Sequence, residues 1–390
     1  MSLEWKTVEL KSIANVTMGQ SPKSEFYNDN FEGMPFLQGN KTFGDKYPSF
    51  ELYTTSIKKV AEKNSVLMSV RAPVGDLNIA QEDICIGRGV CGLQMKKGDN
   101  EFLYYLLKAN ISYLINKESG TVFGSINKND IETFEVTLPK SSDDQMKILT
   151  ILKNIDKKID ICKNLNRNLF NIASSIQTEW MINFTPFKSE KFKSSSFGLI
   201  PENWNVGKLA DVIELLDSKR IPLSGQQREN MEKIYPYYGA ASLMDYVEDY
   251  IFDGVYLLMG EDGTVIDNKG FPILQYVWGK FWVNNHAHIL KGKNGFNVES
   301  LYLLLSKTNI QSIVTGAVQA KVNQTNLKSI EIIIPPVEVM EKFNALIKPF
   351  FDSIRSNNDE IKKLQKLRDT LLPKLMSGEI DVSKINCDLE

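Results

Sequence analysis

Acidic and basic side chains gather in one short segment, and their types would suit metal-dependent cleavage of a phosphodiester. Glu261 and Asp262 are followed by Asp267 and Lys269. Such cleavage needs carboxylates that converge on a metal ion, and no correctly spaced Glu-x-Lys accompanies them here. We therefore predict no catalytic residues in this segment, and a stand-alone nuclease remains only as a minor alternative.

The histidines and cysteines also give little support to a metal site. His286 and His288 would share one face of a strand, but no third ligand is evident, so a hydrogen-bonded structural role is favoured. Cys85 and Cys91 flank an Ile-Gly-Arg-Gly stretch in apolar surroundings, which is typical of buried small side chains. No C-x₂-C pair occurs. We expect no bound metal.

Cofactor chemistry is equally poorly supported by the sequence. There is no GxxxxGK[ST] loop for ATP, no Gly-rich turn suited to a methyl donor, and no Asn/Asp-Pro-Pro-aromatic loop that would grip a base. We expect no cofactor. The composition, with 42% hydrophobic and 24% charged residues, is that of a folded soluble protein. The absence of a long apolar run and of a secretory signal predicts a cytoplasmic protein with no membrane contact.

The polar residues that remain suit recognition of DNA. Arg and Lys match guanine edges in the major groove, and Asn and Gln match adenine edges. Many of them lie beside glycines, as expected for exposed loops. The candidates are Gln38, Asn40, Lys41, Arg71, Arg88, Ser125, Lys128, Lys219, Arg220, Arg228, Tyr238, Asn284, Asn285, Gln319 and Lys321. A net charge of −2 indicates that the chain binds DNA best inside a larger complex.

An internal duplication organises the chain. Residues 119–139 match residues 315–335 at an offset of 196, so that Gly120, Asn127 and Pro139 correspond to Gly316, Asn323 and Pro335. Residues 5–10 resemble residues 204–209. Each half mixes short strands with one clear helix, near 101–117 and near 298–312. We predict an α+β fold with a mainly antiparallel sheet in each half.

A long helical segment with a heptad seam follows each globular half, and corresponding seam positions differ by 195 residues. The first seam contains Ile148, Leu152, Ile155, Ile159, Leu169 and Ile176, and the second contains Phe343, Ile347, Phe350, Ile354, Leu364 and Leu371. A single helix of this kind would expose a long apolar stripe, so we expect the two to pair antiparallel as a coiled coil. The polar seam residues Asn166, Asn357 and Arg368 would fix the register. Pro349 and Pro373 are expected to kink or interrupt the second helix.

These patterns predict a tandem domain organisation. Target recognition domains would occupy residues 1–140 and 201–335. Long helices would occupy residues 141–184 and 336–380, with a linker at 185–200 and a tail at 381–390.

The chain resembles the specificity subunit of type I restriction–modification enzymes. The resemblance rests on the duplicated layout and on local phrases, among them SVRAPVG (69–75), CIGRG (85–89), GEDGTV (260–265), FWVNNHAHIL (281–290) and LRDTLLPKLMSGEI (367–380). It implies a non-catalytic subunit whose two domains each read half of a split double-stranded DNA site. It also implies two copies of a modification (methyltransferase) subunit and a restriction (motor-nuclease) subunit as partners. Because SVRAPVG and CIGRG have no close equivalent in the second half, the site would be asymmetric.

Two other interpretations stay open at this stage. The chain could be a targeting subunit of another defence system, which neighbouring genes would distinguish. It could instead be a protein–protein scaffold, which would bind no methylase and select no DNA sequence.

Overall fold

The computed structural model describes residues 4–115, 124–316 and 319–384. The chain divides into two compact units, one formed by residues 1–160 with 361–390 and the other by residues 161–360. Each unit combines one globular domain with part of each of two long helices. None of the described helices is long and apolar enough to cross a membrane.

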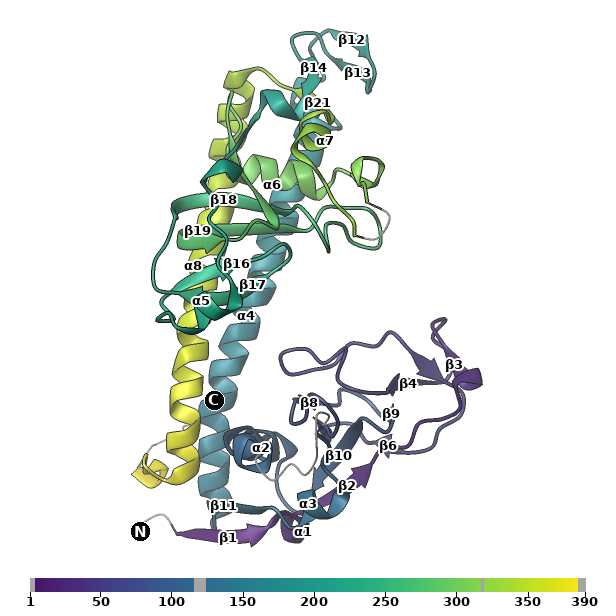
Figure 1. Cartoon of the computed structure of the whole chain (residues 1–390), viewed down its shortest axis with the longest axis vertical. Helices are drawn as coiled ribbons and strands as arrows, with labels where there is room; N and C mark the ends of the chain where they lie inside the picture. Colours follow the sequence, from purple (N-terminus) through teal and green to yellow (C-terminus); the bar gives the residue numbers. More distant parts are fainter. Residues whose placement is uncertain (1–3, 116–123, 317–318, 385–390) are drawn as a thin grey trace. The chain divides into compact units, whose positions relative to one another are not determined.

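The two long helices are α4 (Ser142–Met181) and α8 (Val337–Ser377), of 40 and 41 residues. They run antiparallel, as the sequence predicts (Figure 1). In the first unit, the beginning of α4 shares a core with the end of α8, where Ile148 and Leu152 cluster with Leu372 and Leu375. In the second unit, the end of α4 shares a core with the beginning of α8, where Ala173 clusters with Phe343 and Ile347. The apolar stripes of the helices are therefore buried in both units.

Burial along the seam follows the heptad prediction at most positions but is wider in α8. Ile148, Leu152, Ile155 and Ile159 are buried in α4, and Phe343, Ile347 and Ile354 are buried in α8. Phe350, Leu364, Leu371, Leu169 and Ile176 are only partly buried. Phe351 and Leu372, each one residue after a predicted seam position, are buried instead. A helix that packs against a globular domain as well as a partner helix buries a broader face than a coiled-coil seam alone.

The expectation that proline interrupts the second helix is wrong, because α8 is continuous from Val337 to Ser377. Pro349 and Pro373 are both exposed. Proline removes the bond to the carbonyl four residues earlier, which belongs to Ala345 and Asp369, and both of these residues are exposed too. Water can satisfy those carbonyls, so the helix tolerates each proline on its solvent side.

The first domain contains two small sheets and one main helix. One sheet has the order β2 (Ala14–Met18), β10 (Val90–Met95), β7 (Val66–Ser69) and β8 (Leu77–Ile79). The other has the order β3 (Tyr27–Asn28), β5 (Tyr53–Thr54), β4 (Met34–Leu37), β9 (Ile84–Ile86) and β6 (Val60–Ala61). The helix α2 (Asn100–Ile115) packs against β7, β8 and β10. A separate pair joins β1 (Trp5–Glu9) to β11 (Glu135–Pro139), and the short helices are η1 (Ser24–Phe26), α1 (Leu10–Ile13) and α3 (Lys128–Glu132).

The second domain is built around one larger sheet. Its order is β15 (Ile213–Leu215), β20 (Ala287–Gly292), β18 (Phe252–Gly260), β19 (Leu274–Val283), β16 (Tyr235–Tyr238) and β17 (Leu243–Val247). The helix α6 (Val298–Ser306) packs against β18, β19 and β20. A pair joins β14 (Asn205–Lys208) to β21 (Glu331–Ile334). The short helices are η3 (Leu209–Asp211), η4 (Asp217–Lys219), α5 (Gly225–Glu229), η5 (Gln311–Ile313) and α7 (Gln324–Lys328), and η6 (Val382–Lys384) follows α8 in the first unit.

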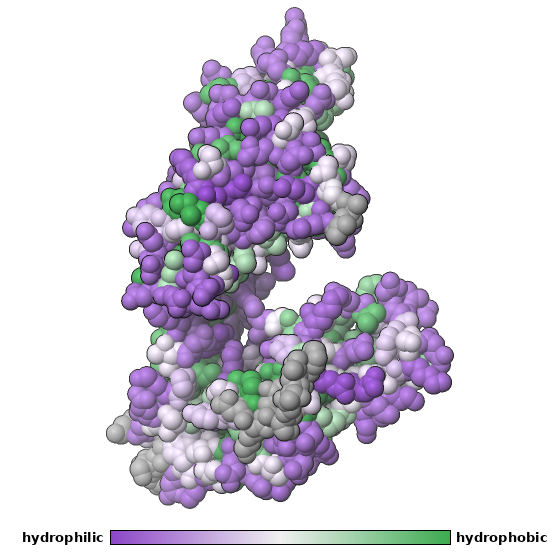
Figure 2. Space-filling view, viewed as in Figure 1, coloured by the Kyte–Doolittle hydropathy of each residue, from purple (hydrophilic) through white to green (hydrophobic). Residues whose placement is uncertain are grey.

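Both domains are mainly antiparallel, with one parallel pair each among the described strands: β4 with β9, and β16 with β19. The predicted linker between the halves is more ordered than a surface loop, because it contains η2 (Thr185–Phe187) and a hairpin of β12 (Phe192–Ser195) and β13 (Gly198–Pro201). In the view of Figure 2 the surface is mostly hydrophilic, with apolar residues in scattered patches, as expected when apolar side chains fill the cores.

The duplication is visible in the structure at the level of single hydrogen bonds. Asn127 caps α3 by accepting a hydrogen bond from the backbone N–H of Asp130, and Asn323 caps α7 in the same way through Asn326. A short polar side chain at this position satisfies a backbone N–H that the first helical turn leaves unpaired. Gly120, another residue of the repeat, lies outside the described residues.

The two units differ at one repeated position between the main helix of the domain and the long helices. In the first unit, Tyr105 of α2 donates a hydrogen bond to Asp156, and Arg368 donates another to Asp156 at 2.9 Å. Burial raises the pKa of Tyr105, and the adjacent Asp156 carboxylate raises it further, so the phenol stays protonated and remains a donor. This cluster of three polar groups lies at the edge of the core.

In the second unit the corresponding cluster is apolar. Tyr302 of α6 contacts Phe351, with ring centroids 6.3 Å apart, and Ala173 is fully buried. Phe351 and Ala173 stand 195 residues from Asp156 and Arg368, respectively. The two units therefore fill the same packing position with different side chains, an ion pair in the first unit and an aromatic ring with an alanine in the second.

We predict that Arg368→Ala lowers the free energy of unfolding by about 2–3 kcal/mol, because it leaves Asp156 buried without its cation. The double variant Asp156→Phe with Arg368→Ala copies the second unit and should recover most of that loss. Urea unfolding of the three proteins measures this. A double variant no more stable than Arg368→Ala would contradict the equivalence of the two positions.

Candidate nucleic-acid interface

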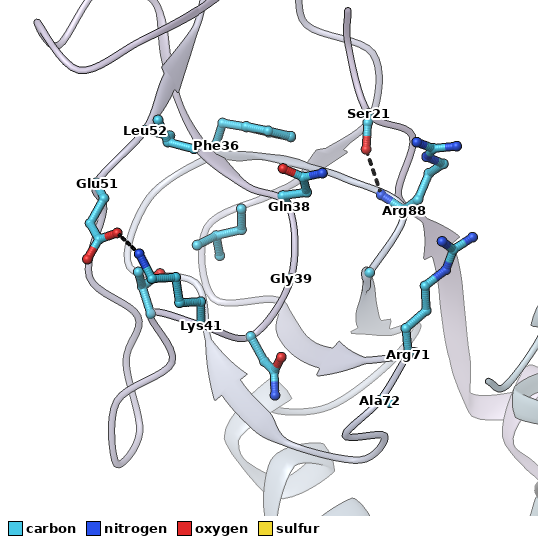
Figure 3. A pocket seen from close by; sticks show the side chains of 14 residues that line it. Ser21, Phe36, Gln38, Gly39, Lys41, Glu51, Leu52, Arg71, Ala72 and Arg88 are labelled. Atoms are coloured by element: carbon cyan, nitrogen blue, oxygen red, sulfur yellow. Dashed lines mark hydrogen bonds and ion pairs between the residues drawn. The ribbon is translucent and has the colours of Figure 1, made fainter. Parts of the chain in front are cut away.

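A polar pocket opens at one end of the first domain, where three segments meet. It has a volume of about 430 Å³ and is lined by loops that follow β4, β7 and β9 (Figure 3). Five of the residues predicted from sequence to contact DNA line it, namely Gln38, Asn40, Lys41, Arg71 and Arg88. Phe36, Leu37 and Leu52 supply its apolar part. The tertiary structure thus gathers into one concavity candidates that are up to 50 residues apart in the chain.

Backbone hydrogen bonds hold the three segments in a fixed relation. Gly87 donates to the carbonyl of Leu37 at 2.8 Å, and Gly89 donates to that of Gln38 at 3.1 Å. Val70, which precedes Arg71, donates to the carbonyl of Gly89 at 2.9 Å. Val70 and Gly89, the chain neighbours of Arg71 and Arg88, are therefore hydrogen-bonded to each other. This bond fixes the position of the backbone from which the two arginine side chains extend.

The glycines of the Ile-Gly-Arg-Gly stretch make this close packing possible. A Cβ atom at Gly89 would lie 2.6 Å from the carbonyl oxygen of Gln38, and one at Gly87 would lie 2.9 Å from the Cα of Gln38. Neither distance leaves room for a side chain. The turn can thus lie flat against the loop after β4, while the side chain of Arg88 stays exposed.

The lining side chains differ in whether they already have partners. Lys41 pairs with Glu51 at 2.7 Å, and Asn40 donates to Asp76 at 2.5 Å. Gln38, Arg71 and Arg88 are exposed, and within the described residues their side-chain polar atoms have no hydrogen-bond or ion-pair partner. These three groups are free to contact a ligand without first breaking a bond in the protein.

The other two candidates of the first domain lie near or beside the pocket. Ser125 forms an isolated β-bridge with Arg71, which places it against the same segment. Lys128 is on α3 and pairs with Glu132 at 3.4 Å, so it belongs to a solvated helix surface.

In the second domain, several predicted residues surround a polar network that was not predicted from the sequence. Arg220 pairs with Glu261 at 2.6 Å and donates to the carbonyl of Ala287 at 2.8 Å. Lys321 lies 3.5 Å from Glu261. Asn284 is buried and accepts a hydrogen bond from the backbone of His286 at 2.8 Å. The side chains of Arg220 and Asn284 therefore have structural partners, whereas Lys219, Asn285 and Gln319 are exposed.

His288 lies at the centre of this network and is fully buried. Its Nδ1 is 2.6 Å from Asp217, and its Nε2 is 2.7 Å from the carbonyl oxygen of Val322. Both ring nitrogens therefore face oxygen atoms of the protein. Asp217 also accepts hydrogen bonds from the backbone of Ile289 and from Gln324, at 2.9 and 2.7 Å.

Asp217, Glu261 and His288 have ligand atoms within 4.8 Å of one another, the composition of a metal site. Their existing bonds favour a different role. Both nitrogens of His288 are engaged, and Arg220 faces both carboxylates, at 2.6 Å from Glu261 and 3.7 Å from Asp217. The network ties η4 to β20, to the residue that follows β18 and to the start of α7, consistent with the structural role expected for the histidines.

Arg228 and Tyr238 lie apart from this network. Arg228 pairs with Asp245 at 3.0 Å and stacks over Tyr237, with its guanidinium carbon 5.0 Å from the ring centre. Tyr238 packs edge-on against Phe281, with centroids 5.8 Å apart. Both side chains hold the sheet edge of the second domain together.

Comparison with known proteins identifies the family. The family described as "Type I restriction modification DNA specificity domain" matches residues 2–170 and again residues 201–366. The chain belongs to this family. The two matches correspond to the two halves of the duplication, so the chain carries the family's domain twice.

Relatives named as type I restriction enzyme specificity subunits match all or part of the chain. The MjaIX specificity subunit of a type I restriction enzyme from Methanocaldococcus jannaschii is 26% identical over 98% of this chain and 95% of its own length. A putative MjaX specificity subunit from the same organism is 44% identical over 40% of this chain and 38% of its own. Among solved structures, the S subunit of a type I system from M. genitalium has a TM-score of 0.55 at 18% identity, covering 96% of each chain. That likeness shows the fold.

We predict that Asp217→Asn destabilises the protein by about 3 kcal/mol near pH 7, because the amide cannot balance His288 and Arg220. Burial alone would raise the pKa of Asp217, but the hydrogen bonds from His288 and the backbone of Ile289 lower it below its ordinary 3.8. A depressed pKa stabilises the fold fully above the unfolded-state value, and the stabilisation is lost as the pH falls through the folded-state value. The difference in unfolding free energy between wild type and variant should therefore shrink as the pH falls below about 4.

Urea unfolding across this pH range tests the prediction. Glu248→Gln, a change at an exposed carboxylate of the same unit, serves as the control and should behave as wild type. A variant whose deficit grows as the pH falls below about 4 would show that the sign is wrong.

Proposed function

We propose that this chain is the DNA-reading subunit of a type I restriction–modification complex, and that its two domains read two unlike halves of one bipartite site. The observation that carries this proposal is the gathering of Gln38, Arg71 and Arg88, all without partners among the described residues, in a pocket of the first domain. Amide and guanidinium groups are the side chains that distinguish base edges. The family to which the chain belongs supports DNA as the ligand.

The asymmetry of the proposed site follows from the differences between the domains. The first domain presents, in a pocket, two arginines without side-chain partners among the described residues, whereas Arg220 and Arg228 of the second domain are engaged by carboxylates. Lys219, Asn285, Gln319 and Lys321 remain as the proposed DNA contacts of the second domain. Unlike side chains in the two readers imply unlike half-sites.

We propose further that the paired long helices dock two modification subunits and that a restriction subunit joins this assembly. Methyl transfer would then belong to the modification subunits, since no cofactor motif occurs in this sequence. The net charge of −2 supports shared DNA binding, because phosphate neutralisation would come largely from partners.

The adenine methylation pattern of the source genome tests the whole proposal. Deleting this gene should remove methylation at one bipartite motif and leave other motifs intact. Purified chain mixed with the modification subunit should shift DNA that carries this motif in a gel. If no methylase is retained and no sequence is selected, the scaffold interpretation replaces this one.

We predict that helix length sets the unread spacer between the half-sites. Removing residues 161–167 and 356–362, which correspond at the 195-residue offset, takes one heptad from each helix. The pair would be ~10 Å shorter at ~1.5 Å per residue, which corresponds to ~3 base pairs. The methylation motif should therefore keep both half-sites and lose about three spacer positions.

The deletion also removes Asn166 and Asn357, which bond to each other at 2.8 Å. The matched control is the double substitution Asn166→Leu with Asn357→Leu, which removes the polar pair and keeps the length. It should leave the spacer unchanged. An unchanged spacer in the deletion variant would contradict the prediction that helix length sets the spacer, but it would not contradict the proposed reading of DNA by the two domains.

A further inference from the structure

We propose that Arg71 and Arg88 are the specificity-determining residues of the first domain and that each reads the O6/N7 edge of a guanine. This inference rests on the proposed DNA-reading function and goes beyond it, because it names the base and the side chains. It predicts that one half of the target contains guanine at the positions these arginines reach.

The arginines of this chain differ sharply in what their side chains contact. The sequence contains seven arginines. Five of them have side-chain hydrogen bonds within the described residues: Arg167 to Asn164, Arg220 to Glu261, Arg228 to Asp245, Arg355 to Glu299 and Arg368 to Asp156. Arg71 and Arg88 are the two for which the described residues supply no such partner, and both line the same pocket.

The backbone that carries these two side chains is held in place by the fold. Figure 3 shows both guanidinium groups on one side of the pocket, away from the Lys41–Glu51 pair. The bond from Val70 to Gly89 joins the residues beside them, and the backbone N–H of Arg88 donates to Ser21 at 3.1 Å. Side chains on a backbone held this way lose less entropy on binding than side chains on a mobile loop.

The charge of the pocket favours a ligand with acceptor atoms. Glu51 is the carboxylate that lines it, and Lys41 already pairs with Glu51. The positive charges of Arg71 and Arg88 are therefore left uncompensated within the lining. A guanidinium presents parallel N–H donors, and guanine presents two acceptors, N7 and O6, on its major-groove edge. Adenine offers one acceptor and one donor there, so it satisfies an arginine less well.

The surroundings favour base reading over contact with phosphate alone. The pocket is concave, and the neighbouring Gln38 side chain, the apolar Phe36 and Leu52, and the exposed arginines together offer contacts of different chemistry. Phosphate contacts position a protein but carry no sequence information, and a flat surface of lysines serves for them. Phosphate binding by these arginines is the outcome that the experiment must separate from base reading.

The test uses the complex of this chain with its modification subunit and the bipartite target obtained from genomic methylation. Duplexes carry 7-deazaguanine, which replaces N7 by C–H, at each guanine of the target in turn. We expect wild type to lose roughly ten- to a hundredfold in affinity at the guanines that Arg71 and Arg88 read. Arg71→Ala and Arg88→Ala should each lose a similar factor on unmodified DNA and become insensitive to 7-deazaguanine at one position.

The control variant is Lys63→Ala, an exposed cation of the same domain outside the pocket lining, which should keep the full sensitivity to 7-deazaguanine. Thermal unfolding checks the fold of each variant. Because Arg71 and Arg88 are exposed and their side chains have no partner among the described residues, their substitution should leave the melting temperature unchanged.

Two results would overturn the inference. One is a target without guanine in either half. The other is a uniform loss across sequences with a shallower salt dependence and retained sensitivity to 7-deazaguanine, which would show phosphate contact. In both cases the complex would still select a motif, so the proposed function would stand. If wild type selects no sequence at all, the proposed function itself fails.

Discussion

Burial of the apolar stripes on α4 and α8 is the constraint on which the other features depend. An isolated helix of 40 residues with a continuous apolar face would be insoluble or marginal in water. In both units the helices share one core with the adjacent domain, so Ile148 and Leu152 cluster with residues of α2, and Phe343 and Ile347 cluster with residues of α6. Each domain thus takes part of its hydrophobic core from the helices.

Apolar contacts are permissive about register, and a few polar groups make the pairing specific. Asn166 bonds to Asn357 in the second unit, and Arg368 bonds to Asp156 in the first. A register shift would leave the buried Asp156 and the half-buried Asn166, Asn357 and Arg368 without partners, which costs more than the bonds themselves contribute. The polar cluster at Tyr105 and its apolar counterpart at Tyr302 also make the two units chemically distinct, although both descend from one repeated pattern.

The two domains that we propose to read DNA also share a backbone framework and differ in their loops. Asn127 and Asn323 cap equivalent helices, and each domain has one parallel strand pair within the described residues. The loops differ. In the first domain a glycine turn presents Arg88 beside Arg71, whereas in the second domain Arg220 is held by Glu261 inside the network around His288. A shared arrangement of strands and helices with different loops suits two domains that recognise different DNA sequences.

The sequence alone determined the duplication, the two long amphipathic helices and the α+β class, because these depend on periodicity and on local capping. It also identified Gln38, Arg71 and Arg88 as candidates by residue type. Tertiary structure decided which candidates have partners within the described residues, because the carboxylates that engage Arg220 and Arg228 are distant in the chain. It also decided that Pro349 lies on the solvent side of α8, where water replaces the lost bond. Periodicity reports which residues face inward, but only the folded chain fixes which charges find partners.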